Sequence, residues 1–191
     1  MRPLWQAGLL LAGLAIIPAA AQRPVRPTTQ VSGTLSFDAR ATLGRFTGTT
    51  ATLTGAITGG PGLEAVRGWV AFPADSLRTG NRLRDRDMRA SLETARFPII
   101  RFALTAVRPS TPQGDTVVVT LAGDFTIHGV TRAVELPATL TWGPDALRLQ
   151  ALLTLDVRDY QVGKLTKAFG TIRMEPEIVV RIDLRFTQDA R

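Results

Sequence analysis

The sequence has no cysteine, one histidine and only two lysines among its 191 residues. Without cysteine the chain can form no disulfide, thiolate nucleophile or thiolate metal site, and its redox compartment cannot be read from cysteine usage. The lone His128 stands beside Gly129 between two expected strands, a position typical of a turn residue, and a zinc site would need further ligands near it. The histidine also lacks a nearby serine nucleophile motif, and the sequence has no glycine-rich phosphate loop. These absences argue against an enzyme and against a bound metal.

A long hydrophobic run occurs only once, at the N-terminus. Arg2 precedes the apolar run from Leu4 to Ile17, and the three alanines Ala19 to Ala21 follow it. This order of positive, apolar and small residues is typical of an export signal that is cleaved after Ala21. The run is shorter than the ~20 residues that a membrane-spanning helix needs, and an uncleaved anchor is the alternative. We therefore expect residues 1–21 to be a signal peptide and the mature protein to be periplasmic or secreted.

The net charge of +7 comes almost wholly from arginine, and aromatic residues make up only 6% of the chain. Because the basic residues are not interleaved with aromatics and the chain looks exported, we expect no nucleic-acid partner. Several arginines cluster in one segment, where they form either a solvated face, partly neutralised by nearby acids, or a patch for phosphate groups or a membrane surface. The cluster consists of Arg78, Arg82, Arg86 and Arg89. A transient membrane-surface contact and a homodimer both stay open at this point.

Most of the mature chain alternates apolar and polar residues, as half-buried strands do. The last strand is the clearest case, and Pro176 on its apolar register predicts a bulge there. Residues 22–30 hold two prolines and almost nothing to bury, so we expect a flexible leader before a single domain over residues 31–187. The expected strands cover residues 31–37, 41–57 (one bent strand or two short ones), 66–72, 99–107, 117–127, 130–142, 147–157 and 172–186.

These strands predict an all-β fold. About eight long amphipathic strands, joined by turns such as the one expected over residues 109–115, are best satisfied by an antiparallel barrel, which leaves no exposed edge. The interior of a barrel of this size is either filled by side chains or holds one small ligand. An outer-membrane barrel would show the same alternation, but here the outward set is rich in arginine and aromatics are few.

The segment from Asp75 to Phe102 interrupts the alternation with good helix formers. Asn81 is the expected N-cap of a short helix, and Pro98 ends the helical conformation because it restricts the residue before it. A segment that leaves a sheet and returns to it can lie across an open end of that sheet, so we expect this excursion to be a lid. One apolar helical face is shared by Leu83, Met88 and Leu92.

Two stretches together resemble the YceI-like family of exported bacterial proteins. They are SLRTGN at 76–81, followed by Arg84-Asp85, Met88, Phe97-Pro98, Ile100 and Phe102, and GDFTIHGVTR at 123–132, followed by Val134 and Leu136. The tail from residue 155 to 186 fits the same plan, so the resemblance covers about residues 31–187. It implies a lipocalin-like antiparallel barrel that carries a polyisoprenoid, a quinone-like molecule or a fatty-chain amphiphile. The sequence departs from the family pattern in the short stretch 38–46 and in the loop after Tyr160.

The candidate site consists of pocket or lid residues, with no catalytic residue, metal ligand or cofactor beyond a bound isoprenoid or other long-chain lipid. Arg84 and Asp85 either clamp a ligand head group or hold the lid shut, or they tie the helix to a strand end. The apolar lid residues either line the mouth of a cavity or plug the barrel end. Tyr160 is a candidate donor to a head group. The full set is Phe72, Leu83, Met88, Leu92, Phe97, Phe102, Leu153, Tyr160, Ile178 and Val180.

The sequence therefore predicts an exported binding protein that sequesters a long-chain apolar ligand inside a β-barrel, with the segment 75–97 controlling access. The alternative is a barrel filled by its own side chains, acting as a structural or interaction module through its basic surface. Ionic strength separates the two, because binding by surface arginines weakens in salt and buried apolar binding does not.

Overall fold

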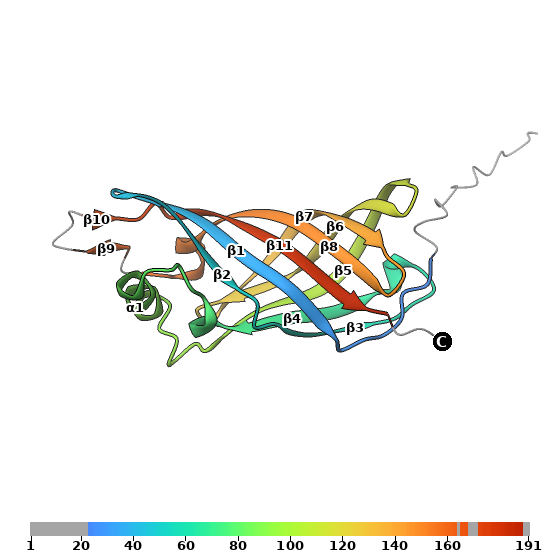
Figure 1. Ribbon diagram of the computed structural model, residues 1–191, viewed down its shortest axis with the longest axis horizontal. Helices are drawn as coiled ribbons and strands as arrows, with labels where there is room; N and C mark the ends of the chain where they lie inside the picture. The colour runs from blue at the N-terminus through green and yellow to red at the C-terminus, as the bar shows by residue number, and fades with distance from the viewer. Residues whose placement is uncertain (1–22, 164, 168–171, 189–191) are drawn as a thin grey trace, which may run out of the picture.

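The computed structural model describes residues 23–163, 165–167 and 172–188 (Figure 1). The predicted signal peptide, residues 1–21, lies outside these ranges, so its cleavage and the export of the chain stay predictions. Within the described ranges, no helix combines the length and the apolar character that a membrane crossing requires.

Nine strands form one curled antiparallel sheet around an apolar interior (Figure 1). Their spatial order is β2-β1-β11-β8-β7-β6-β5-β4-β3, so the two outermost strands are consecutive in the chain. This curled, lipocalin-like half-barrel confirms the predicted fold class. The strands are β1 (Val31–Ala41), β2 (Gly44–Thr50), β3 (Thr54–Thr58), β4 (Arg67–Pro73), β5 (Ile99–Gln113), β6 (Thr116–Ile127), β7 (Val130–Trp142), β8 (Ala146–Asp156) and β11 (Glu177–Thr187).

The remaining elements gather at the two ends of the long axis. Figure 1 shows the helix α1 (Arg82–Ser91) and the small β9–β10 pair (Thr166–Lys167 and Ile172–Arg173) at one end, which we call the mouth end. The opposite end, which we call the closed end, receives residues 23–30 and the short helix η1 (Leu63–Ala65). Two further one-turn helices are η2 (Ala74–Ser76) and η3 (Val157–Tyr160).

Alternation along the strands places one set of side chains inside the sheet, and these form two packed clusters. The closed-end cluster includes Val117, Val119 and Leu63, whose side chains are almost completely buried. The mouth-end cluster includes Leu35, Phe72 and many other residues from β1, β4, β6, β8 and β11. Pairing of β6 with β7 in unbroken register over twelve residue pairs keeps this inward set aligned from one end to the other.

The seam between the outermost strands is closed at the mouth end by the chain that follows β4. Arg78 and Thr49 of β2 exchange two backbone hydrogen bonds, of 2.8 and 3.0 Å. This pairing satisfies part of the free edge of β2 and fixes the start of the lid segment against the barrel.

Several strand boundaries differ from the sequence prediction. β1 continues to Ala41, past the predicted end at residue 37, so the turn to β2 lies at residues 42–43, inside the predicted strand 41–57. β5 continues to Gln113, through the two prolines that predicted a turn over 109–115, because a register shift between Pro109 and Pro112 accommodates them. The predicted last strand is divided: β10 and β11 are separate elements, and Pro176 lies between them. A proline cannot donate to the ladder, so the strand starts only at Glu177.

The predicted leader also differs in one respect. Val25 is only 3% exposed, and its backbone exchanges hydrogen bonds of 3.0 and 2.9 Å with Gly60. Thr28 pairs in the same way with Ile57 of β3. The sequence predicts a leader over residues 22–30 with almost nothing to bury, and within its described part, residues 23–30, Val25 is an exception because it joins the closed-end cluster.

Candidate functional site

The lid helix begins where the sequence predicts. Gly80 takes a positive φ of 74°, and the Asn81 side chain accepts hydrogen bonds from the backbone N–H groups of Leu83 and Arg84, each at 3.0 Å. These bonds satisfy two of the N–H groups that a helix start leaves free, which confirms Asn81 as the N-cap. α1 then continues to Ser91, and the Leu92 N–H closes the last turn onto the carbonyl of Met88.

A buried carboxylate anchors the first turn of α1. Asp85 is 6% exposed and accepts two hydrogen bonds from Thr79, from the backbone N–H at 2.8 Å and from the hydroxyl at 2.6 Å. Burial alone raises the pKa of Asp85, but the Thr79 hydrogen bonds, with Arg78 and Arg89 nearby, outweigh it and lower the pKa below its ordinary value. The ionised carboxylate therefore holds α1 to the chain before it.

Arg84 has a different partner, so the two residues predicted as a clamp do not act through each other. Its guanidinium carbon lies 4.4 Å from the centre of the Phe46 ring, a cation–π arrangement. Since Phe46 belongs to β2, this contact ties α1 to the opposite side of the mouth. Asp85 anchors the helix to Thr79, and Arg84 borders the opening and contacts β2, which fits the alternative that the pair ties α1 to neighbouring segments. A role of Arg84 and Asp85 toward a ligand head group stays a prediction.

The chain after α1 is fixed to the turn between β6 and β7. Phe97 packs against His128 with ring centres 4.5 Å apart, and Glu93 Oε1 lies 3.6 Å from His128 Nε2. His128 and Gly129 take positive φ values of 52° and 74°, which confirms the predicted tight turn. A Cβ at Gly129 would approach the Phe97 ring to 2.5 Å, so glycine is required for this packing.

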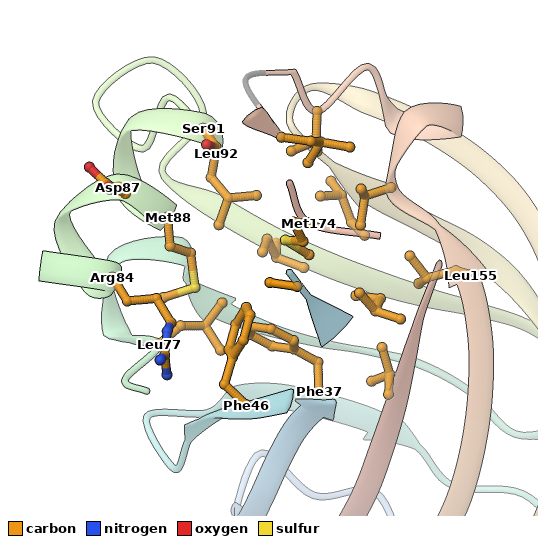
Figure 2. Close-up of a pocket in the computed structure, with 18 of the residues that line it drawn as sticks. Phe37, Phe46, Leu77, Arg84, Asp87, Met88, Ser91, Leu92, Leu155 and Met174 are labelled. Carbon is orange, nitrogen blue, oxygen red and sulfur yellow. The ribbon is translucent and has the colours of Figure 1, made fainter. Parts of the chain in front are cut away.

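An apolar cavity of about 330 Å³ lies between α1 and the inner face of the barrel, and we call it the mouth cavity. Figure 2 shows Met88 and Leu92 pointing from α1 into it, toward Met174. Among the described residues, its barrel-side lining is apolar: Leu35, Phe37, Ala41, Leu43, Phe46, Phe72, Leu77, Ile100, Phe125, Ile127, Leu155, Val157, Val162, Leu165, Met174, Ile178 and Val180.

In the part of the chain that the structure describes, the polar residues of the mouth cavity all come from the side of α1. The four polar residues of its lining are the N-cap and three residues of α1: Asn81, Arg84, Asp87 and Ser91. In Figure 2, Arg84 lies toward Phe46 while Asp87 points away from the cavity. The cavity thus has an apolar floor and a polar edge, which is the arrangement that an amphiphile with a long apolar tail requires.

A second cavity of about 80 Å³ lies deeper in the barrel, and we call it the inner cavity. It shares Leu35, Phe72 and Phe125 with the mouth cavity, so these three side chains form the partition between the two. The partition is well packed, with the Phe125 ring 6.3 Å from Phe102 and 6.0 Å from Tyr160. A chain longer than the mouth cavity would have to displace the partition.

The structure brings together part of the predicted site. Seven predicted residues line the mouth cavity: Phe72, Leu83, Arg84, Met88, Leu92, Ile178 and Val180. Phe102 and Leu153 line the inner cavity instead, and Phe97 packs on His128 outside both linings. Tyr160 is 2% exposed behind Phe125; burial and then Asp159 raise its pKa, against the effect of Arg132. A buried phenol in that place is part of the core rather than of the opening.

Sequence reasoning missed several residues that line the mouth cavity. Leu35 and Phe37 lie on the apolar face of β1, so the alternation predicts that their side chains point into the barrel. Their position along the barrel depends on how β1 pairs with β11, for example Leu35 opposite Ile182. That register cannot be predicted from the residues of β1 alone. Met174 reaches the cavity from the break after β10, where a continuous strand was expected.

Comparisons with known proteins agree with this fold. The family model described as the YceI-like domain matches residues 27–186 of the chain. No curated protein sequence matches it.

Solved structures of similar fold share little sequence with it. BcnA of Burkholderia cenocepacia is 13% identical with a TM-score of 0.67, covering 81% of this chain and 95% of its own. A domain of Saccharophagus degradans described as polyisoprenoid-binding is 14% identical with a TM-score of 0.67, covering 85% of this chain and 98% of its own. The YceI protein of Campylobacter jejuni is 15% identical with a TM-score of 0.60, covering 75% and 85%. At these identities the likeness concerns the fold.

Proposed function

This chain belongs to the family of YceI-like domain proteins, and on that premise we propose that it is an exported carrier that encloses a long-chain apolar ligand in its mouth cavity. The observation that supports this most strongly is the lining itself, whose described residues are apolar except along α1 and its N-cap. Its volume of about 330 Å³ falls within the range of ~300–1,000 Å³ typical of small-molecule sites. The described fold neighbour from Saccharophagus degradans, named as polyisoprenoid-binding, is consistent with such a ligand.

Solvation supplies the binding energy in this proposal, and no covalent step is needed. Each buried CH₂ contributes ~0.8 kcal/mol, so a ten-carbon stretch supplies about 8 kcal/mol before the costs of ordering the ligand and the lid. The protein acts as a binding protein rather than an enzyme, because its contribution is to remove an apolar chain from water.

The asymmetric lining orients the ligand. A polar head group would lie along α1, beside Arg84 and Ser91, and the tail would extend over Phe37 and Ile178 toward the partition. A polyisoprenoid, a quinone-like molecule and a fatty-chain amphiphile all satisfy this arrangement. They differ in how far the tail reaches, and the longer ones require Leu35, Phe72 and Phe125 to move so that the inner cavity becomes accessible.

A second candidate function is a structural or interaction module that acts through basic residues of its surface. One observation favours it: apart from the inner cavity of about 80 Å³, the closed half of the barrel is filled by its own side chains, with Val117 0% and Leu63 1% exposed. In that case the mouth cavity would be incidental, and an acidic partner would bind the arginines of the outer face.

Uptake of a fluorescent fatty-chain or prenyl probe by the delipidated mature protein, measured at low and high salt, tests the proposal. We expect saturable uptake that persists at high ionic strength, because apolar burial is not screened. Absence of uptake, together with salt-sensitive binding to an acidic protein, would replace the carrier by the interaction module. Export to the periplasm or medium is checked separately, by the N-terminal sequence of the mature protein.

A further inference from the structure

We propose that the rim of the mouth cavity docks on an anionic phospholipid surface, so that the cavity opens toward the bilayer. The use of this docking to load or release a ligand rests on the proposed function above. The docking itself rests on exposed residues of the rim and can be tested without any ligand.

Two exposed leucines on separate elements border the same opening. Leu43, at the tip of the hairpin between β1 and β2, is 80% exposed, and Leu83 on α1 is 59% exposed. Both also line the mouth cavity. A single exposed leucine is ordinary, but two that continue an apolar cavity wall out to its rim make one connected apolar surface.

Arginines accompany these leucines on both elements. Arg45 follows Leu43 by two residues and is exposed, with Arg40 opposite it in the hairpin. These two arginines line an outer-wall groove that also contains Arg181, Asp38, Glu175 and Glu177, so the charges in that groove balance.

On α1 the positive charge is less balanced. The helix carries four arginines, Arg82, Arg84, Arg86 and Arg89, against two aspartates. Asp85 is buried and bonded to Thr79, and Asp87 lies 3.8 Å from Arg86. A rim with exposed leucines and excess guanidinium groups is the pattern of surfaces that insert shallowly among anionic lipids.

Of the partners that could bind the arginines of the rim, the residues around the opening favour a phospholipid surface. An acidic protein or a nucleic acid would pair with the arginines but would leave Leu43 and Leu83 beside water at the edge of an apolar cavity. A phospholipid surface supplies phosphates for the guanidinium groups and acyl chains for the leucines at the same depth.

The test is flotation of the mature protein with vesicles of phosphatidylcholine alone or mixed with phosphatidylglycerol. We expect binding to the mixed vesicles that weakens at high salt, and weaker binding to phosphatidylcholine. The double variant Leu43→Ser/Leu83→Ser should bind the mixed vesicles about tenfold more weakly. Its matched control is Leu152→Ser, a 56% exposed leucine on β8 that lines only an outer-wall groove, and it should bind within about twofold of the wild type.

Equal vesicle binding by the double variant and by the Leu152→Ser control would overturn the proposal, as would a wild type that binds neither vesicle. Thermal melting of each variant shows whether it is folded; substitutions at exposed sites change stability little. Probe uptake by the wild type without vesicles separates the two proposals. Uptake without vesicle binding removes the docking alone, and vesicle binding without uptake removes the carrier function alone.

Discussion

The two ends of this barrel are built from the same alternating strands but are filled in different ways. At the closed end, Val25 and Leu63 come from segments outside the strands and occupy the interior, 3% and 1% exposed. At the mouth end, α1 crosses the opening and places Met88 and Leu92 at the border of a cavity of about 330 Å³. The closed end is a packed core that borders the inner cavity of about 80 Å³, and the mouth end surrounds the larger mouth cavity.

This difference shows that strand alternation alone does not decide between a core and a cavity. Alternation sends apolar side chains inward at both ends, and the connecting segments then decide whether the space between them is occupied. η1 places Leu63 in the barrel interior, whereas α1 leaves Leu83 and Arg86 exposed. The predictions below test this contrast.

The partition between the two cavities should show the largest effect. Phe125→Ala removes a 6% exposed ring that belongs to both linings, so we expect a loss of ~3–5 kcal/mol in unfolding free energy and a shift of uptake toward longer apolar chains. Phe186→Ala is the matched control, since Phe186 is 5% exposed and lines the inner cavity only. Denaturant unfolding and a chain-length series of probes measure both effects; the same chain-length preference in the two variants would contradict the partition.

The closed end should respond to truncation far more than the lid does. Leu63→Ala should lower the unfolding free energy by ~2–5 kcal/mol, because it leaves a void in a fully packed region. Leu83→Ala, the same change at a 59% exposed site, should stay within about 0.5 kcal/mol. Equal losses in denaturant unfolding would mean that the two ends are packed alike.

The anchor of α1 should depend on pH. The pKa of Asp85 is lowered in the folded state, so its stabilisation is fully present above the ordinary carboxyl pKa of about 3.9 and is lost as the pH falls through the lowered folded value. Asp85→Asn should therefore cost ~1.5–3 kcal/mol at neutral pH, and the gap to the wild type should shrink below about pH 4.

The control for this anchor is Asp75→Asn, an exposed carboxylate of the same segment, which should change stability by less than about 0.5 kcal/mol. Thermal melting between pH 2.5 and 7 measures both variants. A gap that stays constant down to the lowest pH would show that the charge of Asp85 is not what holds the helix.

The smallest effect on stability, and a specific one on binding, is expected at the rim. Leu83→Glu should weaken uptake of an apolar probe about tenfold, about 1.4 kcal/mol, while the melting temperature hardly changes. Leu152→Glu, at a similarly exposed site on the outer wall, should leave uptake as it is. Unchanged uptake by Leu83→Glu would argue against passage of the ligand beside α1.

Local patterns were enough to predict most of the fold. The period-two alternation predicted the strands, Asn81 predicted the start of α1, and His128-Gly129 predicted the tight turn. Each of these features depends on residues that are neighbours in the sequence. What failed depends on distant partners. Val25 is buried because Gly60 pairs with it, and β5 passes Pro109 because its register to β6 shifts there.

The candidate site could be predicted only in part, because some of its residues are placed by partners that are distant in the sequence. Met88 and Leu92 share a helical face, so their common direction follows from spacing alone. Phe102 of β5 lies opposite Val70, and Phe72 of β4 lies opposite Ile100. The register between these strands places Phe102 in the lining of the inner cavity and Phe72 in the partition. Arg84 and Asp85 are adjacent in sequence, yet their side chains leave the helix in different directions and find different partners.

Native mass spectrometry of the mature protein purified from its own host, followed by solvent extraction, tests the carrier account most directly. The account predicts a discrete added mass that organic solvent releases as a long-chain lipid, and its loss should leave a protein that takes up prenyl or fatty-chain probes. A bare mass, with no uptake of such probes afterwards, would contradict it and would mean that the mouth cavity is not a binding site.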